Sequence, residues 1–189
     1  GGLKAGDALI LTKPIGTGTL FAAHAKLAAK GRWIDSALAS MIQSNQSAAH
    51  CLHRFGSKAC TDVTGFGLLG HLVEMTRPSG VDAELDLSAI PVLPGAEETA
   101  AAGILSSLQP ANIRLRRGIR DQERWVNHPR YPLIFDPQTA GGLLASVPAA
   151  VADDCVRELK ALGYPHTAII GRVLPQDDTG PIEPITLRD

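Results

Sequence analysis

Two kinds of hydrophobic pattern run along this chain, and each predicts one kind of element. Short apolar runs and strict alternation are typical of strands, which we expect at residues 7–12, 59–62, 81–87, 131–135, 143–147 and 167–174. Apolar residues at helical spacing indicate helices at about 19–30, 36–54, 64–76, 95–102 and 149–162. The chain therefore predicts strands and helices mixed throughout its length.

Two stretches predict more than a single element. The strands at 131–135 and 143–147 are joined by a Gly-rich turn, which suggests a hairpin. Asp35 is a plausible N-cap for one long helix over 36–54, with an apolar stripe formed by Leu38, Met41, Ala48, Ala49 and Leu52.

Asn45 lies in the middle of that stripe. A buried amide without partners costs about 1–3 kcal/mol, so it must be bonded. Asn45 therefore either ties down a neighbouring loop or faces a ligand site.

This mixture of elements, with at least one hairpin, predicts an α/β (α+β) layered domain with a mixed β-sheet flanked by helices. The 189 residues are enough for a proper hydrophobic core. We expect one domain over 1–175 and a Pro-rich tail over 176–189. The chain starts without methionine and reaches a strand within a few residues, so it resembles a piece of a longer protein.

Composition and charge exclude several classes of function. A net charge of −1 and 4% aromatic residues argue against a nucleic-acid-binding protein. No apolar run is as long as a membrane span, and no signal peptide is visible. The six arginines between 114 and 130 either face phosphates or form a solvated, partly disordered face, and the second is more typical of such a charge run.

The three cysteines, Cys51, Cys60 and Cys155, are widely spaced and form no CxxC pair. Neither a disulfide framework nor a zinc site is therefore indicated, and we expect a cytoplasmic protein. Cys60 is expected to be a buried small hydrophobe, with a thiol pKa raised by Asp62. The His50-Cys51-x-His53 cluster is weak evidence for a metal and is more typical of packing.

Three polar turns, at 13–18, 61–67 and 136–142, each follow a strand-like run. Sites on layered α/β folds gather at such strand ends. The first turn is not a P-loop because its lysine precedes the glycines, so Lys13 is either a phosphate contact or a solvent-exposed residue. Asp136 can start a turn through its side chain.

The turn at 61–67 carries the most chemistry. It leads into a helix whose early turns contain glycines, and a helix N-terminus with glycines favours phosphate. Asp62 in the same place would repel a phosphate unless a cation lay between them, and Mg²⁺ prefers such a set of oxygens. Asp62 is therefore either a metal ligand or a local helix cap. His71 lies about two helical turns further on and is an unlikely phosphate ligand.

Four segments together resemble one family. The segment 59–71 reads ACTDVTGFGLLGH, 13–18 reads KPIGTG, 44–45 is Ser-Asn, and 136–144 reads DPQTAGGLL. This set resembles the C-terminal domain of selenophosphate synthetase (selenide, water dikinase), a domain of the aminoimidazole ribonucleotide synthetase superfamily. The matches run in order from about residue 6 to residue 173.

The resemblance implies an enzyme that converts ATP, selenide and water to selenophosphate, AMP and phosphate, with Mg²⁺ and usually K⁺. It implies Asp62 as a metal ligand, and it leaves Thr61, Thr64, Gly65, Asn45 and Lys13 as the candidates that face nucleotide or phosphate. The family's catalytic loop, its other metal ligands and most of its homodimer interface belong to an N-terminal domain. No catalytic residue is therefore expected in this chain, which we expect to be inactive by itself.

Two other hypotheses stay open. The same domain can act as a non-catalytic binding or regulatory module in a fusion or a degenerate paralogue. It can also belong to another kinase or synthetase of the same fold, with a different acceptor.

Overall fold

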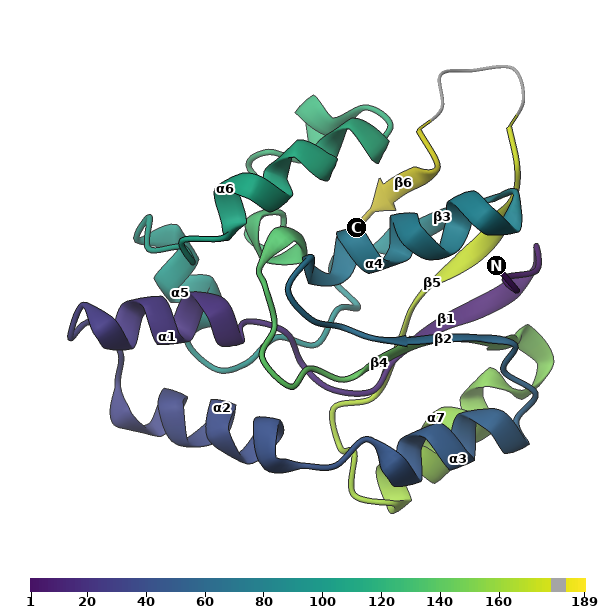
Figure 1. The fold of residues 1–189 in the computed structure, drawn as a ribbon, viewed down its shortest axis with the longest axis horizontal. Coiled ribbons are helices and arrows are strands. Elements are labelled where there is room, and N and C mark those ends of the chain that lie inside the picture. The colour runs from purple at the N-terminus through teal and green to yellow at the C-terminus, as the bar shows by residue number, and fades with distance from the viewer. Residues whose placement is uncertain (178–182) are drawn as a thin grey trace.

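A six-stranded sheet forms the centre of the molecule (Figure 1). The computed structural model describes residues 1–177 and 183–189. Across the sheet the strand order is β2-β4-β1-β5-β3-β6, and neighbours are antiparallel except for the parallel pair of β3 and β6. The strands are β1 (Asp7–Leu11), β2 (Ala59–Asp62), β3 (Val81–Asp86), β4 (Leu143–Pro148), β5 (Ala168–Pro175) and β6 (Ile185–Arg188). The expected mixed sheet is confirmed.

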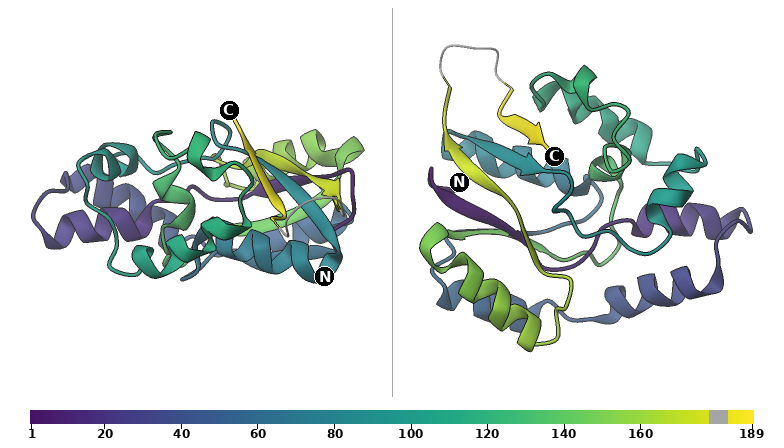
Figure 2. Two further views of the ribbon diagram at one scale, coloured as in Figure 1. Left: turned by 90° about the horizontal axis from the view of Figure 1, so that it is seen from above. Right: turned by 180° about the vertical axis from the view of Figure 1, so that it is seen from behind.

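Helices cover both faces of this sheet, as the views in Figure 2 show. The α-helices are α1 (Thr17–Ala25), α2 (Gly31–Ile42), α3 (Gln46–Arg54), α4 (Gly67–Thr76), α5 (Ala96–Ala101), α6 (Gln109–Asn112) and α7 (Ala152–Ala161). The short 3₁₀ helices are Arg77–Ser79, Ile113–Gly118, Gln122–Arg124, Pro132–Phe135 and Ala149–Val151. None of the helices in the described ranges has the length and apolar character that crossing a membrane requires.

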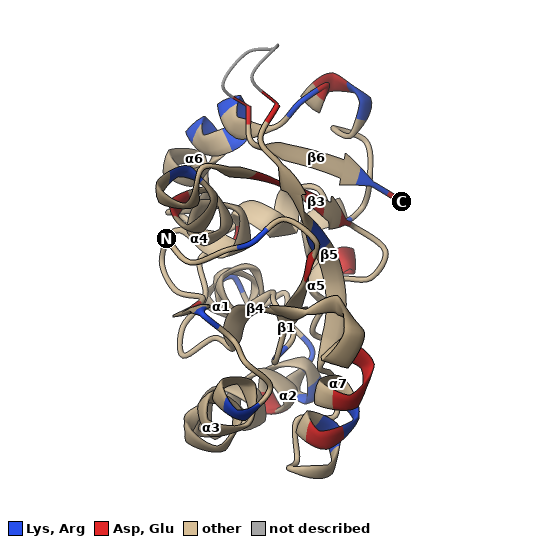
Figure 3. Cartoon of the chain, turned by 90° about the vertical axis from the view of Figure 1, so that its right-hand side faces the viewer, with Lys and Arg blue, Asp and Glu red and all other residues tan. Residues whose placement is uncertain are grey.

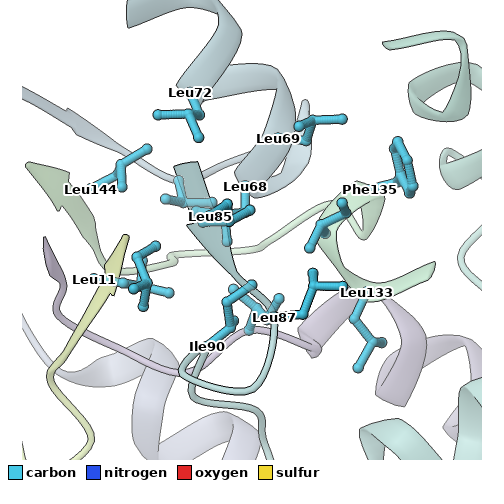
Figure 4. Packing of buried hydrophobic residues seen from close by; sticks show 14 of the residues in the cluster. Leu11, Leu68, Leu69, Leu72, Leu85, Leu87, Ile90, Leu133, Phe135 and Leu144 are labelled. Carbon is cyan, nitrogen blue, oxygen red and sulfur yellow. The ribbon is translucent and has the colours of Figure 1, made fainter. Parts of the chain in front are cut away.

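Each face of the sheet has its own hydrophobic cluster, because side chains alternate along the strands. In β1, Leu9 and Leu11 join the cluster under α4, whereas Ala8 and Ile10 join the cluster with α3 and α7. Figure 4 shows leucines of α4 packed toward Leu11 and the strands. Burial on both faces explains why β1 appears in the sequence as a continuous apolar run.

The segment 131–135 was expected to be a strand and is instead a 3₁₀ helix, Pro132–Phe135, after Tyr131. Its Leu133, Ile134 and Phe135 are all buried, so a continuous apolar run does not distinguish the two structures here. Pro132 lacks an N–H group and suits the first turn of a helix. The predicted hairpin is therefore wrong, and β4 pairs with β1 and β2.

The single helix expected over 36–54 is two helices, with Asp35 inside α2 and not at a cap. The chain turns at Gln43 and Ser44, although no glycine or proline marks the break. Tertiary contacts hold it, because Lys13 Nζ donates to the Gln43 carbonyl (2.6 Å) and the Tyr164 hydroxyl donates to the Ser44 carbonyl (2.6 Å). The predicted stripe is accordingly broken: Leu38 is exposed, while Ala48 and Leu52 are buried.

The arginine-rich segment is only partly solvated. Arg120 forms ion pairs with Asp82 and Asp177, and Arg130 pairs with Glu97 and donates to three main-chain carbonyls. The expectation of a disordered face is wrong for these two arginines, while Arg114, Arg116, Arg117 and Arg124 are exposed. Figure 3 shows acidic and basic residues together along β3, β5 and β6, where Arg172 and Arg188 both pair with Glu84.

The segment expected to be a Pro-rich tail contributes the last strand of the sheet. Ile185–Arg188 forms β6 beside β3, with Ile185 and Leu187 buried. Residues 178–182 of the expected tail lie outside the described residues. The sheet therefore extends beyond residue 175, because apolar residues at 185 and 187 alternate as a half-buried strand requires.

Candidate functional site

The three polar turns of the sequence meet at one edge of the sheet. Strands β1 and β2 run in the same direction with β4 antiparallel between them, so the ends of β1 and β2 lie beside the start of β4. Two hydrogen bonds join the second and third turns, from Val63 N to the Gly142 carbonyl (2.8 Å) and from Gln138 N to the Thr64 carbonyl (3.0 Å). The turn at 136–142 is thus the centre of the arrangement.

Gln138 joins the third turn to the first. Its Oε1 accepts hydrogen bonds from Gly16 N (3.0 Å), Thr17 N (3.2 Å) and Thr17 Oγ1 (3.1 Å). These donors lie at the start of α1, where a helix has unpaired N–H groups. The N-terminus of α1 is therefore occupied by the protein's own amide.

Asp136 binds the same helix start. The carboxylate accepts from Gly18 N (3.1 Å) and Thr19 Oγ1 (2.8 Å), and it is completely buried. Burial raises the pKa of Asp136 to about 6, against the opposing effect of its hydrogen bonds. Asp136 is thus a long-range cap of α1. The sequence predicted only a turn before Pro137 and gave no sign of this cap.

Asp62 is the last residue of β2, and its side chain is exposed. Among the described residues, no hydrogen-bond donor or cation contacts its carboxylate. Helix α4 begins only at Gly67, and no side chain caps its N-terminus. The alternative of Asp62 as a local cap is therefore not what the structure shows, and the carboxylate is free to bind a ligand.

His71 holds the turn that follows Asp62. Its Nε2 accepts from Thr64 N (3.1 Å) and lies 3.1 Å from Thr64 Oγ1, while its Nδ1 is 3.5 Å from Glu74 Oε2. His71 reaches Thr64 because helical side chains tilt toward the N-terminus and α4 starts three residues after Thr64. The expectation that His71 is an unlikely phosphate ligand is not affected by this contact. The sequence did not predict this contact between His71 and the turn.

Thr61 and Gly65 flank Asp62 and Thr64. Thr61 is half-buried, with Oγ1 3.3 Å from the Asp62 carbonyl oxygen, and Gly65 is exposed. The Gly65 carbonyl accepts from Asn112 Nδ2 (2.8 Å), which fixes the turn to α6. A Cβ added at Gly65 would meet no atom within 4 Å, so open space adjoins the backbone there.

Lys13 is buried, with 2% of its surface exposed, so the expectation of a solvent-exposed side chain is wrong. Its ammonium donates to the carbonyls of Gln43 (2.6 Å) and Ala140 (3.2 Å) and, within the described residues, forms no ion pair with a carboxylate. Burial lowers the pKa of Lys13. Lys13 thus joins the first turn, the break after α2 and the third turn.

Asn45 also holds the third turn. Its Nδ2 donates to the Gly141 carbonyl (2.9 Å), so it ties down a neighbouring loop, the first of the two roles considered. Its Oδ1 is buried without a hydrogen-bond partner in the described residues. Lys13, Asn45 and Thr64 therefore meet around residues 138–141, while Asp62 and Gly65 lie on the exposed side.

The cysteines are all free thiols. Cys51 and Cys155 are buried, whereas Cys60 is exposed, so its expected burial is wrong: it faces away from the core at the edge strand β2. The pKa of Cys60 is raised, first by partial desolvation and then by Asp62, as expected in direction. His50 and His53 are exposed on α3, whose Cys51 points into the core.

The turn at 61–67 offers one metal ligand, the carboxylate of Asp62, and not a complete metal site. Within residues 1–177 and 183–189, no three His, Cys, Asp or Glu side chains gather as a metal site. The free carboxylate of Asp62 fits a divalent ion that takes its other ligands from phosphate, water or another domain. The arrangement can thus present one anionic ligand beside an accessible glycine turn.

Comparisons of the sequence with a family model and with curated proteins point to the same family. The model of the AIR synthase related protein, C-terminal domain, matches residues 4–182. The selenide, water dikinase of Clostridioides difficile is 35% identical over 93% of this chain and 50% of its own length. The enzyme of the same name from Treponema denticola is 38% identical over 93% of this chain and 50% of its own length. The chain spans about half the length of the curated relatives it matches.

Solved structures agree on the fold. E. coli HypE, a hydrogenase maturation protein, superimposes with a TM-score of 0.70 at 20% identity, over 99% of this chain and 48% of that one. Thiamine monophosphate kinase from Aquifex aeolicus gives 0.57 at 15% identity, over 98% and 51%. The chain therefore belongs to the AIR synthase related family, as a C-terminal domain of the kind found in the selenide, water dikinases.

Proposed function

We propose that this chain is the C-terminal domain of an ATP-dependent selenophosphate synthetase. The reaction would convert ATP, selenide and water to selenophosphate, AMP and phosphate. The observation that carries the proposal is the turn at 61–67, where a free, exposed carboxylate stands beside a turn with space for a ligand. The selenide, water dikinases that match over 92–94% of this chain support the choice of reaction.

In this proposal Asp62 is one ligand of a Mg²⁺ ion that also binds nucleotide phosphates. The ion would neutralise charge that builds up on the phosphate oxygens. Thr61, Thr64 and Gly65 would face the nucleotide, with His71 holding Thr64 in place. Asn45 and Lys13 would act mainly by fixing the loop at 138–142. K⁺ would be a further activating ion.

The domain would provide half of the site. One carboxylate seldom holds Mg²⁺, which usually binds one or two carboxylates together with phosphate. The remaining metal ligands, the reactive loop and the main homodimer contacts would come from an N-terminal domain. The three free cysteines suit the reducing cytoplasm that we expect for such an enzyme.

The test is an assay of the longer protein for products from ATP. Selenide-dependent formation of AMP, with two phosphorus-containing products beside it, is expected. Formation of ADP with another acceptor would contradict the proposal and favour a different kinase of the same fold. Absence of any turnover, in a protein whose Asp62 region is intact, would favour the non-catalytic module.

A further inference from the structure

A second feature of the chain, a cavity next to Lys13, is not used by the proposed reaction. The cavity has a volume of about 300 Å³ and lies between α2, the end of β1 and the loop at 163–166. At about 30 Å³ per water-sized atom, it holds a molecule of around ten non-hydrogen atoms. It is therefore large enough for a small metabolite.

The chemistry of the wall is one-sided. Polar groups come from Lys13, Ser36, Ser40 and His166, and no Asp or Glu is among the described lining residues. Thr12, Gln43 and Tyr164 also line the cavity, and their side chains are hydrogen-bonded to main-chain groups of the protein. Leu93 and several prolines supply apolar surface. A wall with a cation, hydroxyl groups and apolar patches suits a small anion attached to an apolar body.

Lys13 is the unusual member of this wall. A buried ammonium is normally paired with a carboxylate, because an isolated buried charge is costly. Here the ammonium donates to two neutral carbonyls, of Gln43 and Ala140, although it has three N–H donors. Gln43 also lines the cavity, so the carbonyl that lies 2.6 Å from Lys13 Nζ belongs to a residue of the cavity wall.

We infer that this cavity binds a small organic anion, a carboxylate or a phosphate ester, with Lys13 as its counter-charge. The inference does not depend on the identity of the proposed reaction. Lys13 also donates to the Ala140 carbonyl, and the next carbonyl, Gly141, accepts from Asn45. A bound anion would therefore compete for the donor that helps to hold the loop at 138–142.

Binding can be tested with matched probes on the whole chain. Benzoate and phenyl phosphate supply the two anionic groups on one apolar ring, inorganic phosphate supplies the anion alone, and benzamide is the neutral match of benzoate. Amide chemical shifts of Ser36, Ser40 and Gly163 would report occupancy of the cavity. We expect saturable shifts with at least one aromatic anion and none with benzamide.

Three variants assign the binding to this place. Lys13→Met should raise the dissociation constant at least tenfold, which corresponds to a loss of about 1.4 kcal/mol in binding free energy. Ser40→Phe should block the cavity while Lys13 stays in place, which covers the case in which Lys13→Met fails to fold. Lys26→Met, at an exposed lysine outside the cavity, is the control and should bind as the wild type does.

The relative affinities of the probes show which anionic group the cavity binds. Preference for phenyl phosphate over benzoate identifies a phosphate ester, and the reverse preference identifies a carboxylate. Equal binding of benzamide and benzoate, unchanged binding by Ser40→Phe, or the absence of saturable shifts with every probe would each overturn the inference.

Discussion

The main-chain N–H of Thr64 donates a hydrogen bond of 3.1 Å to Nε2 of His71. This bond runs from the turn after β2 to the second turn of α4, and it requires Nε2 to be unprotonated. The buried imidazole thereby fixes the backbone next to Asp62. The shape of the candidate nucleotide-facing turn thus depends on a residue that does not itself reach the exposed side.

Replacing His71 with alanine should destabilise the chain. Thr64 N would lose its acceptor in a part-buried place, at a cost of about 1–3 kcal/mol in the free energy of unfolding. Urea denaturation measures this loss. Glu74→Gln is the matched control, because Glu74 is mostly exposed and should change stability by less than about 0.5 kcal/mol. Equal stability of the two variants would show that the hydrogen bond does not hold the turn.

Asp136 should make stability depend on pH. Its pKa is raised to about 6 in the folded chain, so between about pH 4 and pH 6 the native state binds more protons than the unfolded state. Stability contributed by this group therefore falls as the pH rises through that window, by about 3 kcal/mol in total. The measurement is urea denaturation at several pH values.

Asp136→Asn should remove that pH dependence, so the variant gains stability relative to the wild type as the pH rises from 4 to 7. Asp35→Asn, at an exposed position of α2, is the control. A constant difference between Asp136→Asn and the wild type across the window would refute the assignment.

Two glycines of the candidate site should differ in how much stability they lose when replaced by alanine. A Cβ at Gly141 would lie 2.1 Å from the Val63 carbonyl oxygen, a backbone atom that cannot move aside, so Gly141→Ala should cost about 1–3 kcal/mol. Gly65→Ala meets open space and should leave stability unchanged. In the longer protein, however, it should raise the KM for ATP if this turn faces the nucleotide. An unchanged KM would count against that part of the proposal.

The central sheet could be predicted from the sequence because its strands leave strong local signals. The alternation in Val81–Asp86 and the apolar run in Asp7–Leu11 both became strands, and the mixed sheet followed. The error at 131–135 has a physical reason, since a fully buried 3₁₀ turn and a buried strand show the same apolar run. The break after Ile42 depends on Lys13 and Tyr164, which are distant in sequence and leave no local signal.

The turns of the candidate site could be predicted from the sequence, but the contacts between them could not. Glycines and an aspartate after a strand mark the turn at 61–67 in the sequence. The burial of Lys13, the long-range cap by Asp136 and the contact of His71 with Thr64 all depend on tertiary packing. Contacts between residues that are distant in sequence leave no pattern in one sequence, so these roles became visible only in the structure.

The isolated chain should bind nucleotide weakly. Asp62 is the one candidate metal ligand of the turn, and Mg²⁺ needs further oxygen ligands. Isothermal titration with Mg-ATP should therefore give little heat. A dissociation constant in the micromolar range would show that this domain forms a complete site by itself.

The most direct test of the account replaces Asp62 with asparagine in the longer protein and measures selenide-dependent ATP turnover together with the melting temperature. Loss of one metal ligand should lower turnover by about 100-fold or more. The melting temperature should stay nearly unchanged, because the carboxylate is exposed and no described residue binds it. Retained turnover with a large fall in melting temperature would contradict the account, since Asp62 would then be a structural residue.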